Sequence, residues 1–493
     1  MGKKILLLGL IILLLSAKSY GYFTMTPALD MAHSQLLELR IFSAQKIIQE
    51  EKIKQPENSL CYYLESYLMV TKILLEDDKN LYEKLAKNED YFLKKTAEDS
   101  DKNSPYYAFV RAEIKLQWAF VKTKFGDEIS AAWSMRQAYK LLSENTRSFP
   151  DFLPQRKSLG MLQILIGSVP EQYTWIVHTA GLYGDIKTGM TNMKAASRLA
   201  DNFGEEAQLL TALVQVYILH QPQEAIATLA AKYKANSSNL LVCFLYGTVL
   251  CKNAQSEAAL PVFLNYPKGA DYGHLMTISY MIGEIFLQKS QYEKAITYYD
   301  FFIKKHKGIN YKKDAHYKIF LAYWLQNKRK EAQLYFDKIR TEGRSTVEAD
   351  RYAAQVYEQG AWPNPVLMHV RLATDGGYHE QAQEALKQLN TNILSKNKKD
   401  LVEYFYRSAR LYHQTRDTAQ AIYFYKQTVE QGKDLPYYFA ANSALQLGYL
   451  YQAQGNAAAA CQSFERTLAF RKHEYKNSLD NKAKAAISAL NCR

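Results

Sequence analysis

The sequence predicts an all-α protein, a right-handed superhelical solenoid of antiparallel helix pairs. Nearly every segment after residue 27 has apolar residues at helical spacing over roughly 12 to 20 positions, followed by a short polar turn. Only 22 glycines and 12 prolines occur among 493 residues, which is too few for a turn-rich all-β chain. With 48% hydrophobic and 23% charged residues, the composition indicates a folded chain.

Residues 1–21 predict a secretory signal peptide. Lys3 and Lys4 precede an unbroken apolar run from Ile5 to Leu15, and small residues follow before Gly21. This run is shorter than the ~20 residues that span a bilayer as a helix. Cleavage after Gly21 would release an exported protein of the periplasm or cell envelope. The alternative is an uncleaved N-terminal anchor.

Residues 22–200 are expected to form an N-terminal helical region of degenerate repeats. The polar stretch Asp99–Asn103 predicts a loop. The stretch Gly181–Gly189 has three glycines without the spacing of a phosphate-binding loop, so we expect an interhelical turn there. Amphipathic patterns predict helices over Asp30–Lys52, Asn58–Leu75, Tyr106–Lys124, Asp127–Asn145, Phe152–Gly167 and Ile186–Asn202.

Residues 205–470 repeat one pattern, which is clearest at Gly448, Ala460 and Phe464. A small residue is followed by an alanine twelve positions later, and a large apolar or aromatic residue comes four positions after that. We expect the alanine to let the second helix of each pair pack into the notch left by the small residue. The alanines of the seven copies are Ala225, Ala259, Ala295, Ala332, Ala382, Ala421 and Ala460.

This pattern resembles the tetratricopeptide repeat, a helix–turn–helix unit of about 34 residues. The chain departs from it, because the Trp of the repeat is missing in every copy and the final Pro is seldom in place. Residues 152–190 are similar to the middle of the eukaryotic inclusion-body-clearance (tetratricopeptide-repeat 39) family. Residues 436–490 look like the end of exported tetratricopeptide proteins of Gram-negative bacteria. These resemblances imply a concave surface that binds proteins, and they bring no catalytic residue.

The last helix is expected at residues 477–490, where four apolar side chains share one face and would cap the open end of the solenoid. Five cysteines are present, and Cys461 and Cys492 would pair if the last helices pack together. We favour instead a role as small buried hydrophobic residues. Cys243 and Cys251 lie about 12 Å apart along one predicted helix, which is too far for a disulfide.

The candidate partner-binding residues are Tyr280, Tyr449, Arg407 and Arg410, which are expected on the inward faces of first helices. Tyrosine and arginine are typical of binding hot spots. The two arginines would suit an acidic group, although exposure to solvent is their simpler role. The Lys and Asn clamp with which chaperone-adaptor tetratricopeptide domains hold a carboxylate is missing from the corresponding positions.

No motif for catalysis, a metal or a cofactor occurs, because HExxH, CxxC and GxSxG are all absent. Enzymatic activity and a cofactor are therefore not predicted. The formal charge of +13 is dispersed along the chain and no nucleic-acid-binding module is present, so nucleic acid is not an expected partner. Peripheral contact with an anionic envelope surface is compatible with the basic charge.

The leading hypothesis is therefore an exported scaffold that binds a protein or peptide partner, with a role in cell-envelope assembly or secretion. The basic charge and the 38 tyrosines also suit a binder of envelope glycan or lipid, which is the alternative. An enzyme whose active residues converge from distant helices is a third hypothesis.

Overall fold

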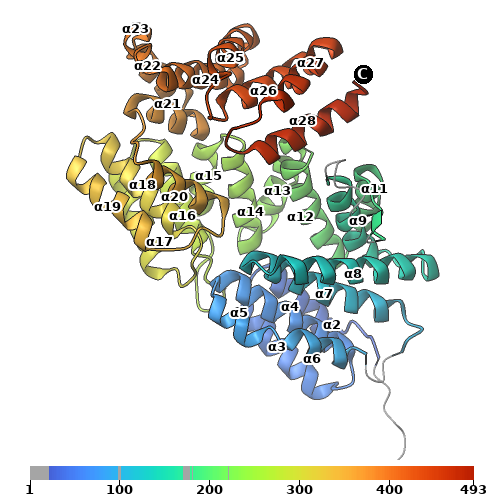
Figure 1. Cartoon of the computed structure of the whole chain (residues 1–493). Coiled ribbons are helices and arrows are strands. Elements are labelled where there is room, and N and C mark those ends of the chain that lie inside the picture. Colours follow the sequence, from blue (N-terminus) through green and yellow to red (C-terminus); the bar gives the residue numbers. More distant parts are fainter. Residues whose placement is uncertain (1–21, 98–100, 170–177, 180, 220, 493) are drawn as a thin grey trace, which may run out of the picture.

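The computed structural model describes residues 22–97, 101–169, 178–179, 181–219 and 221–492. The predicted signal peptide therefore lies outside the described residues. Within them the chain is helical throughout, and the only extended pairing is an isolated bridge between Tyr22 and Asn58. The prediction of an all-α solenoid is confirmed, and the hairpins wind in chain order from the N-terminal to the C-terminal end of the molecule (Figure 1).

Consecutive helices pack as hairpins, so each buries its apolar face against a neighbour in the chain. The N-terminal hairpins are α2 (Pro27–Leu37) with α3 (Ile41–Lys54), α7 (Pro105–Phe125) with α8 (Glu128–Ser148), α9 (Pro154–Gly167) with α11 (Ile186–Ala196), and α12 (Asn202–Tyr217) with α13 (Pro222–Ala235). Between the first two lie α4 (Ser59–Glu76), α5 (Lys79–Leu85) and α6 (Asn88–Lys95).

The later hairpins continue the same winding. They are α14 (Leu240–Lys252) with α15 (Ser256–Leu264), α16 (Thr277–Gln288) with α17 (Tyr292–Lys305), α18 (Lys312–Leu325) with α19 (Arg329–Thr341), α21 (Pro365–Gly376) with α22 (His379–Lys387), α24 (Lys398–Gln414) with α25 (Thr418–Gly432), and α26 (Phe439–Ala453) with α27 (Ala457–Ala469). The single helices α20 (Glu348–Gln359) and α23 (Thr391–Leu394) interrupt the series, and α28 (Lys476–Leu490) packs on α27 as the predicted cap.

In the hairpins with glycine at the notch, that glycine makes room for the ring sixteen positions later. The ring of Tyr299 lies 3.1 Å from where a Cβ on Gly283 would be, and a Cβ on Gly448 would overlap the ring of Phe464. The second helix thus packs into the notch as expected, and it is its ring that fills the space. All seven second-helix alanines are fully buried, as close packing of the two helices requires.

One copy of the repeat has Phe320 at the notch. There the two rings pack directly on each other, with the centroids of Phe320 and Phe336 4.9 Å apart. Paired aromatic rings of this kind stabilise a core beyond their burial alone. A large residue is therefore accommodated at the notch by ring-on-ring packing.

The hairpin turns share one backbone conformation. Seven positions after the notch, one residue has a positive φ, and the next N–H donates to the carbonyl five residues earlier. Left-handed residues at this position are Ala254, Ser290, Asn327, Gly377, Arg416 and Gly455. Leu39 and Gly126 have the same φ and the same hydrogen bond, so α2–α3 and α7–α8 use the turn of the later repeats.

Two helix predictions in the N-terminal region are wrong in their boundaries. The predicted helix Asp30–Lys52 is two helices, because the left-handed turn at Leu39 breaks it. The predicted helix Ile186–Asn202 ends at Ala196, and Asn202 begins the next helix. The expected turn over Gly181–Gly189 ends at Asp185, whose carboxylate accepts the backbone N–H of Thr188 and caps α11.

A disulfide joins Cys461 of α27 to Cys492, just after α28. The role that we favoured for these two residues, as small buried hydrophobic side chains, is therefore wrong. Cys61, Cys243 and Cys251 carry free thiols. The cap is thus attached to the last repeat covalently as well as through its apolar face.

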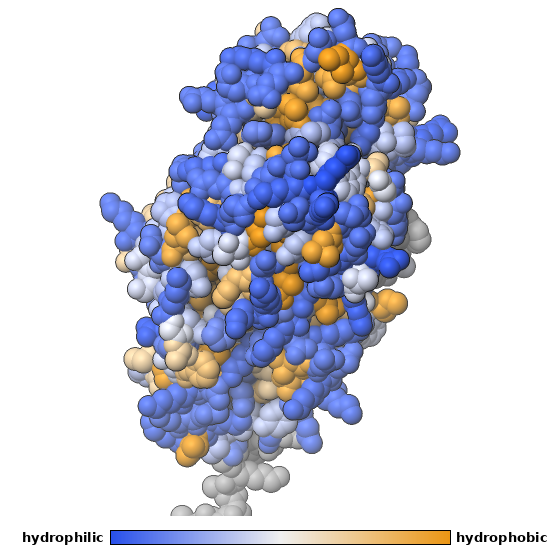
Figure 2. All heavy atoms as spheres, turned by 90° about the vertical axis from the view of Figure 1, so that its left-hand side faces the viewer, coloured by the Kyte–Doolittle hydropathy of each residue, from blue (hydrophilic) through white to orange (hydrophobic). Residues whose placement is uncertain are grey.

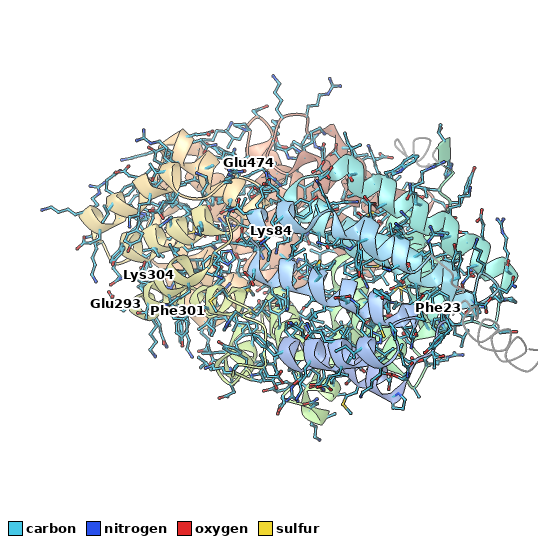
Figure 3. The ribbon with its side chains drawn as sticks, turned by 90° about the horizontal axis from the view of Figure 1, so that it is seen from below. Phe23, Lys84, Glu293, Phe301, Lys304 and Glu474 are labelled. Carbon is cyan, nitrogen blue, oxygen red and sulfur yellow. A yellow bond between two sulfur atoms is a disulfide. The ribbon has the colours of Figure 1, made fainter. Side chains whose placement is uncertain are left out.

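The solenoid also closes on itself through contacts that we call the closure contacts, made by Arg40, Ser43, Asp77, Asp271, His306 and Asn310. Asp271 accepts hydrogen bonds from Arg40 Nε at 2.7 Å and from the backbone N–H of Ser43 at 2.8 Å. Asp77 accepts one from Asn310 Nδ2 at 3.0 Å and lies 3.2 Å from His306 Nε2. These residues are 228 to 233 positions apart. The N-terminal helices thereby hold the loops of the central repeats, which lie beside them when the molecule is seen from below (Figure 3).

The face of the molecule seen in Figure 2 is mainly hydrophilic, with small hydrophobic areas scattered over it. Phe301 of α17 is an exposed hydrophobic residue, with 46% of its surface accessible (Figure 3). Among the described residues, no helix combines the length and apolar character needed to cross a bilayer. The larger hollows of the molecule are lined by first helices.

Candidate binding groove

A polar groove runs along the first helices of the central and later repeats, and we call it the central groove. Its main cavity has a volume of about 320 Å³ and continues into a narrower part of about 50 Å³. Side chains of α16, α18, α20, α21 and α24 line it, including Tyr280, Tyr317, Tyr352, Arg371, Glu403 and Arg407.

Helical spacing places these side chains on one face. On α16, Tyr280 and Glu284 lie four positions apart, and on α21 the same spacing joins Arg371 and Asp375. Adjacent repeats then pair residues about one repeat apart. Lys318 Nζ lies 3.0 Å from the carboxylate of Glu284, 34 residues away, and similar bonds 34 to 36 residues apart recur along the groove.

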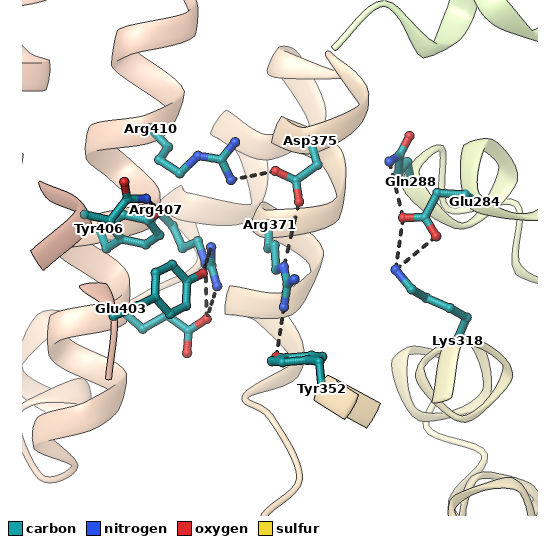
Figure 4. Close-up of polar contacts among 12 residues, drawn as sticks. Glu284, Gln288, Lys318, Tyr352, Arg371, Asp375, Glu403, Tyr406, Arg407 and Arg410 are labelled. Atoms are coloured by element: carbon teal, nitrogen blue, oxygen red, sulfur yellow. Dashed lines mark hydrogen bonds and ion pairs between the residues drawn. The ribbon is translucent and has the colours of Figure 1, made fainter. Parts of the chain in front are cut away.

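The centre of the groove holds a chain of paired charges (Figure 4). Arg410 Nη1 donates to Asp375 Oδ1 at 2.6 Å, and Arg371 Nε lies 3.7 Å from Asp375 Oδ2. Arg371 also donates to the hydroxyl of Tyr352 at 3.1 Å and lies over its ring. Burial would raise the pKa of Asp375, but the surrounding guanidinium groups outweigh it and hold that pKa below its usual range.

Arg407 is almost fully buried, with 2% of its surface accessible. Its guanidinium donates to Glu403 Oε1 at 2.8 and 3.1 Å and lies over the rings of Tyr406 and Phe439. The simpler role that we gave it, exposure to solvent, is therefore wrong. Arg410 is partly accessible and is held by Asp375.

The structure brings two of the four candidate residues to the central groove and links a third to it. Tyr280 lines the main cavity and donates its hydroxyl to Asp314, whose pKa is raised by burial. Arg407 lines the narrower part, and Arg410 joins the network through Asp375. Tyr449 lies elsewhere, because its ring packs against Phe464 within its own hairpin, at 5.3 Å between centroids.

Sequence analysis missed Tyr352, Arg371, Glu474 and Tyr475, which all line the groove. Arg371 follows the notch position of its hairpin, as Arg410 does in the next one, so the repeat register could have found it. Tyr352 belongs to the extra helix α20, outside any repeat. The remaining two lie in the connection between α27 and α28, for which the repeat pattern makes no prediction.

A second hollow lies among the first helices of the N-terminal half, and we call it the apolar cavity. It has a volume of about 300 Å³, and each of seven helices contributes aliphatic side chains, among them Leu37, Leu74, Leu116, Met161, Leu209 and Leu245. Its polar wall is an ion cluster in which Lys157 Nζ lies 2.8 Å from Glu113 and 2.6 Å from Glu206. The cluster is buried, so its charges neutralise one another internally.

Among the described residues, no three His, Cys, Asp or Glu side chains lie close enough together to hold a metal ion. The groove presents hydrogen-bonding groups, ion pairs and aromatic rings.

The hairpins, their common turn and the contacts 34 to 36 residues apart define a solenoid of the tetratricopeptide-repeat type. No family model and no curated protein matches the chain. Solved structures with a similar fold include a tetratricopeptide repeat protein from Parabacteroides merdae, at 18% identity over 57% of this chain and 98% of that one, with a TM-score of 0.25. The tetratricopeptide-repeat domain of P58(IPK) is 14% identical over 84% of this chain and 98% of that one, with a TM-score of 0.20. A monomeric mutant of IFIT1 with m7Gppp-AAAA is 14% identical over 88% and 79%, with a TM-score of 0.30.

Proposed function

We propose that this protein is a scaffold that binds an extended segment of a partner polypeptide in the central groove. The observation that carries the proposal is the row of tyrosines and paired charges on successive first helices. Such a surface offers aromatic contacts and hydrogen bonds to a peptide backbone, which needs both donors and acceptors.

The pairing of charges also argues for a polypeptide over a nucleic acid. Lys318, Arg371, Arg407 and Arg410 each lie beside a carboxylate of the same groove. A nucleic acid gains affinity when basic side chains of the protein replace the counterions on its phosphates. In the groove these basic side chains are already neutralised by the neighbouring carboxylates. A segment with both polar and aromatic side chains fits this environment better than a polyanion.

Peptides selected from a random display library on the mature chain would test the groove. We expect them to bind with one-to-one stoichiometry in calorimetry and to lose about tenfold in affinity, or ~1.4 kcal/mol, in Tyr352→Ala. Tyr423→Ala is the matched control, because Tyr423 is 54% exposed on a second helix. Equal affinity for wild type and Tyr352→Ala would contradict binding in the groove.

We propose further that the protein is exported and works in the cell envelope, in its assembly or in secretion. The charge, apolar run and small residues of positions 1–21 support export. The mass of the protein isolated from its cells should correspond to a chain beginning at Tyr22. A full-length mass with recovery in the membrane pellet would instead show an uncleaved anchor.

The apolar cavity favours lipid over glycan as the ligand of a second candidate function. Its aliphatic walls suit an acyl chain, whereas a glycan needs many hydrogen-bond partners. A fluorescent fatty acid should bind the wild type and be excluded by Leu210→Trp, which fills the cavity. Leu334→Trp, at a residue exposed on α19, is the control. Undiminished binding to Leu210→Trp would exclude the cavity as the lipid site.

A further inference from the structure

The chain itself places a segment in the central groove. Residues 470–475 connect α27 to α28, and we call them, together with Lys476 at the start of α28, the strap. Tyr475 lines the main cavity together with Tyr352 and Arg371, and Glu474 lines the narrower part. The ring of Tyr475 packs edge-on against Tyr438, at 5.3 Å between centroids. An acidic residue followed by an aromatic one thus occupies the surface that we propose for a partner.

The carboxylate of Glu474 lies in a partly dehydrated part of the groove that holds both basic and acidic groups. Burial and the charge of Glu403 raise its pKa, although the backbone N–H of Tyr438 and the charges of Lys399 and Arg371 act in the opposite direction. The last three groups line the groove and belong to the turn before α26, to α24 and to α21. They make the kinds of contact that an acidic side chain of a bound peptide would need.

The cap is held in place chiefly by its own apolar face and by the disulfide, and the ring of Tyr475 also packs against the same apolar cluster. Its apolar face, with Leu479, Ala483 and Ala486, is buried against the last repeat, and the disulfide attaches its end to α27. Tyr475 also has a left-handed backbone, with φ of 58°, which is unfavourable for a residue with a Cβ. Release of the strap would relieve this strain while the cap stays attached.

We propose that Glu474 and Tyr475 act as an internal ligand of the central groove, and that the natural partner carries an acidic residue followed by an aromatic one. This inference rests on the proposed function. A tethered segment has an effective concentration near the millimolar range, so a free peptide must compete against it. The strap therefore indicates which side chains the partner carries. A partner binds only when its affinity is high enough to displace the strap.

The test supplies the strap as a separate molecule. A fluorescent peptide with the sequence of residues 470–476 is titrated into the full chain with the double substitution Glu474→Gln and Tyr475→Ala. We expect binding at least tenfold tighter than to wild type, and loss of that binding when Tyr352→Ala is added. A peptide with the same two substitutions should not bind. Absence of binding to the double variant, or equal binding to wild type, would overturn the inference.

Matched variants separate release of the strap from loss of folding. Arg471→Ala with Lys472→Ala changes two exposed strap residues and should bind the peptide as weakly as wild type. Cys492→Ser leaves groove and strap intact but frees the end of the cap, so we expect affinity between those of wild type and the double variant. Affinity equal to wild type in Cys492→Ser, with the double variant also unchanged, would count against an internal ligand.

The library peptides distinguish failure of this inference from failure of the proposed function. Peptides that depend on Tyr352 but bind wild type and the double variant equally would overturn the internal ligand and leave the groove function standing. Enrichment of acidic–aromatic pairs, with tighter binding to the double variant, would support both. A library that yields no peptide dependent on Tyr352, while the strap peptide binds the double variant, would overturn the partner-binding function alone.

Discussion

Gly448 and Gly283 occupy the same position in two hairpins, yet the space around them differs. A Cβ on Gly448 would overlap the ring of Phe464, whereas one on Gly283 would lie 3.1 Å from the ring of Tyr299. Both sites are inside helices, where alanine is intrinsically favoured over glycine by about 1 kcal/mol. At both positions, close packing therefore favours glycine whereas helix propensity favours alanine. The packing is tighter at Gly448 than at Gly283.

Gly448→Ala should destabilise the protein by about 1–2 kcal/mol, because overpacking outweighs the gain in helix propensity. Gly283→Ala should change stability by less than about 1 kcal/mol, since a small shift of Tyr299 relieves the contact. Urea denaturation followed by circular dichroism measures both. A larger loss for Gly283→Ala than for Gly448→Ala would contradict the account of the notch.

Asp350 links pH to stability. It is fully buried on α20 and accepts the backbone N–H groups of Tyr311 and Asp314 at the start of α18. Burial raises its pKa to about 6, against the opposing effect of those N–H donors. The folded state thus keeps this proton up to about pH 6, whereas the unfolded chain releases it near pH 4.

Because the folded state binds more protons between these values, the contribution of Asp350 to stability is full below about pH 4 and is lost as the pH rises to about 6. The difference in unfolding free energy between wild type and Asp350→Asn should therefore fall by about 2 kcal/mol over that range and stay constant above it. Denaturant titrations at pH 4, 5, 6 and 7 measure this. A flat difference would show that Asp350 ionises normally.

At the level of helices, the sequence pattern located the repeated hairpins well because their alanines and rings recur in register. It failed at the turn around Leu39, which lies outside the clear repeats and carries no glycine or proline. Leu39 adopts the left-handed turn although leucine rarely does so, and this is why one helix was expected over Asp30–Lys52. The short helices α5, α6 and α20 depend on tertiary contacts that a local periodicity cannot show.

The candidate site was predictable only in part, for a similar reason. Tyr280, Arg407 and Arg410 occupy inward register positions that the repeat defines. Tyr449 occupies such a position too, but near the end of the solenoid it packs on Phe464 within its own hairpin. Arg407 pairs with Glu403 of its own helix, but it also lies against Phe439 of the neighbouring repeat, so its burial could not be read from its own helix alone.

The disulfide should stabilise α28 locally. It closes a loop with a sequence separation of 31 residues, for which chain entropy gives about 3.7 kcal/mol. Cys492→Ser should therefore increase hydrogen exchange in α28 by up to roughly 500-fold and leave α14 unchanged. Cys251→Ser is the control, because that thiol is free. Unchanged exchange in α28 would mean that its apolar face alone holds it.

On the scale of the whole molecule, the first helices line two hollows of different character. The N-terminal half encloses aliphatic side chains, whereas the central and C-terminal repeats present paired charges and tyrosines. The apolar cavity is lined by residues of several helices between α2 and α14, so the sequence of no single helix predicts it. The closure contacts hold the N-terminal half against the central repeats.

Removal of the closure contacts should open the superhelix. Asp271→Ala with Asp77→Ala deletes the acceptors of both contacts, and each lost charged hydrogen bond costs about 1–3 kcal/mol. Small-angle scattering should show a larger radius of gyration with unchanged helix content in circular dichroism. Glu331→Ala, at an exposed residue of α19, is the control. An unchanged radius would mean that stacking of neighbouring repeats alone sets the curvature.

The closure contacts also bear on how the chain folds. An open repeat array folds by nearest-neighbour steps, so it can begin anywhere and come apart piece by piece. Contacts across about 230 residues add a loop-closure step that cannot occur until the intervening hairpins have formed. The closed protein therefore gains a late folding barrier and a more cooperative unfolding transition, while the opened double variant would unfold in stages from its ends.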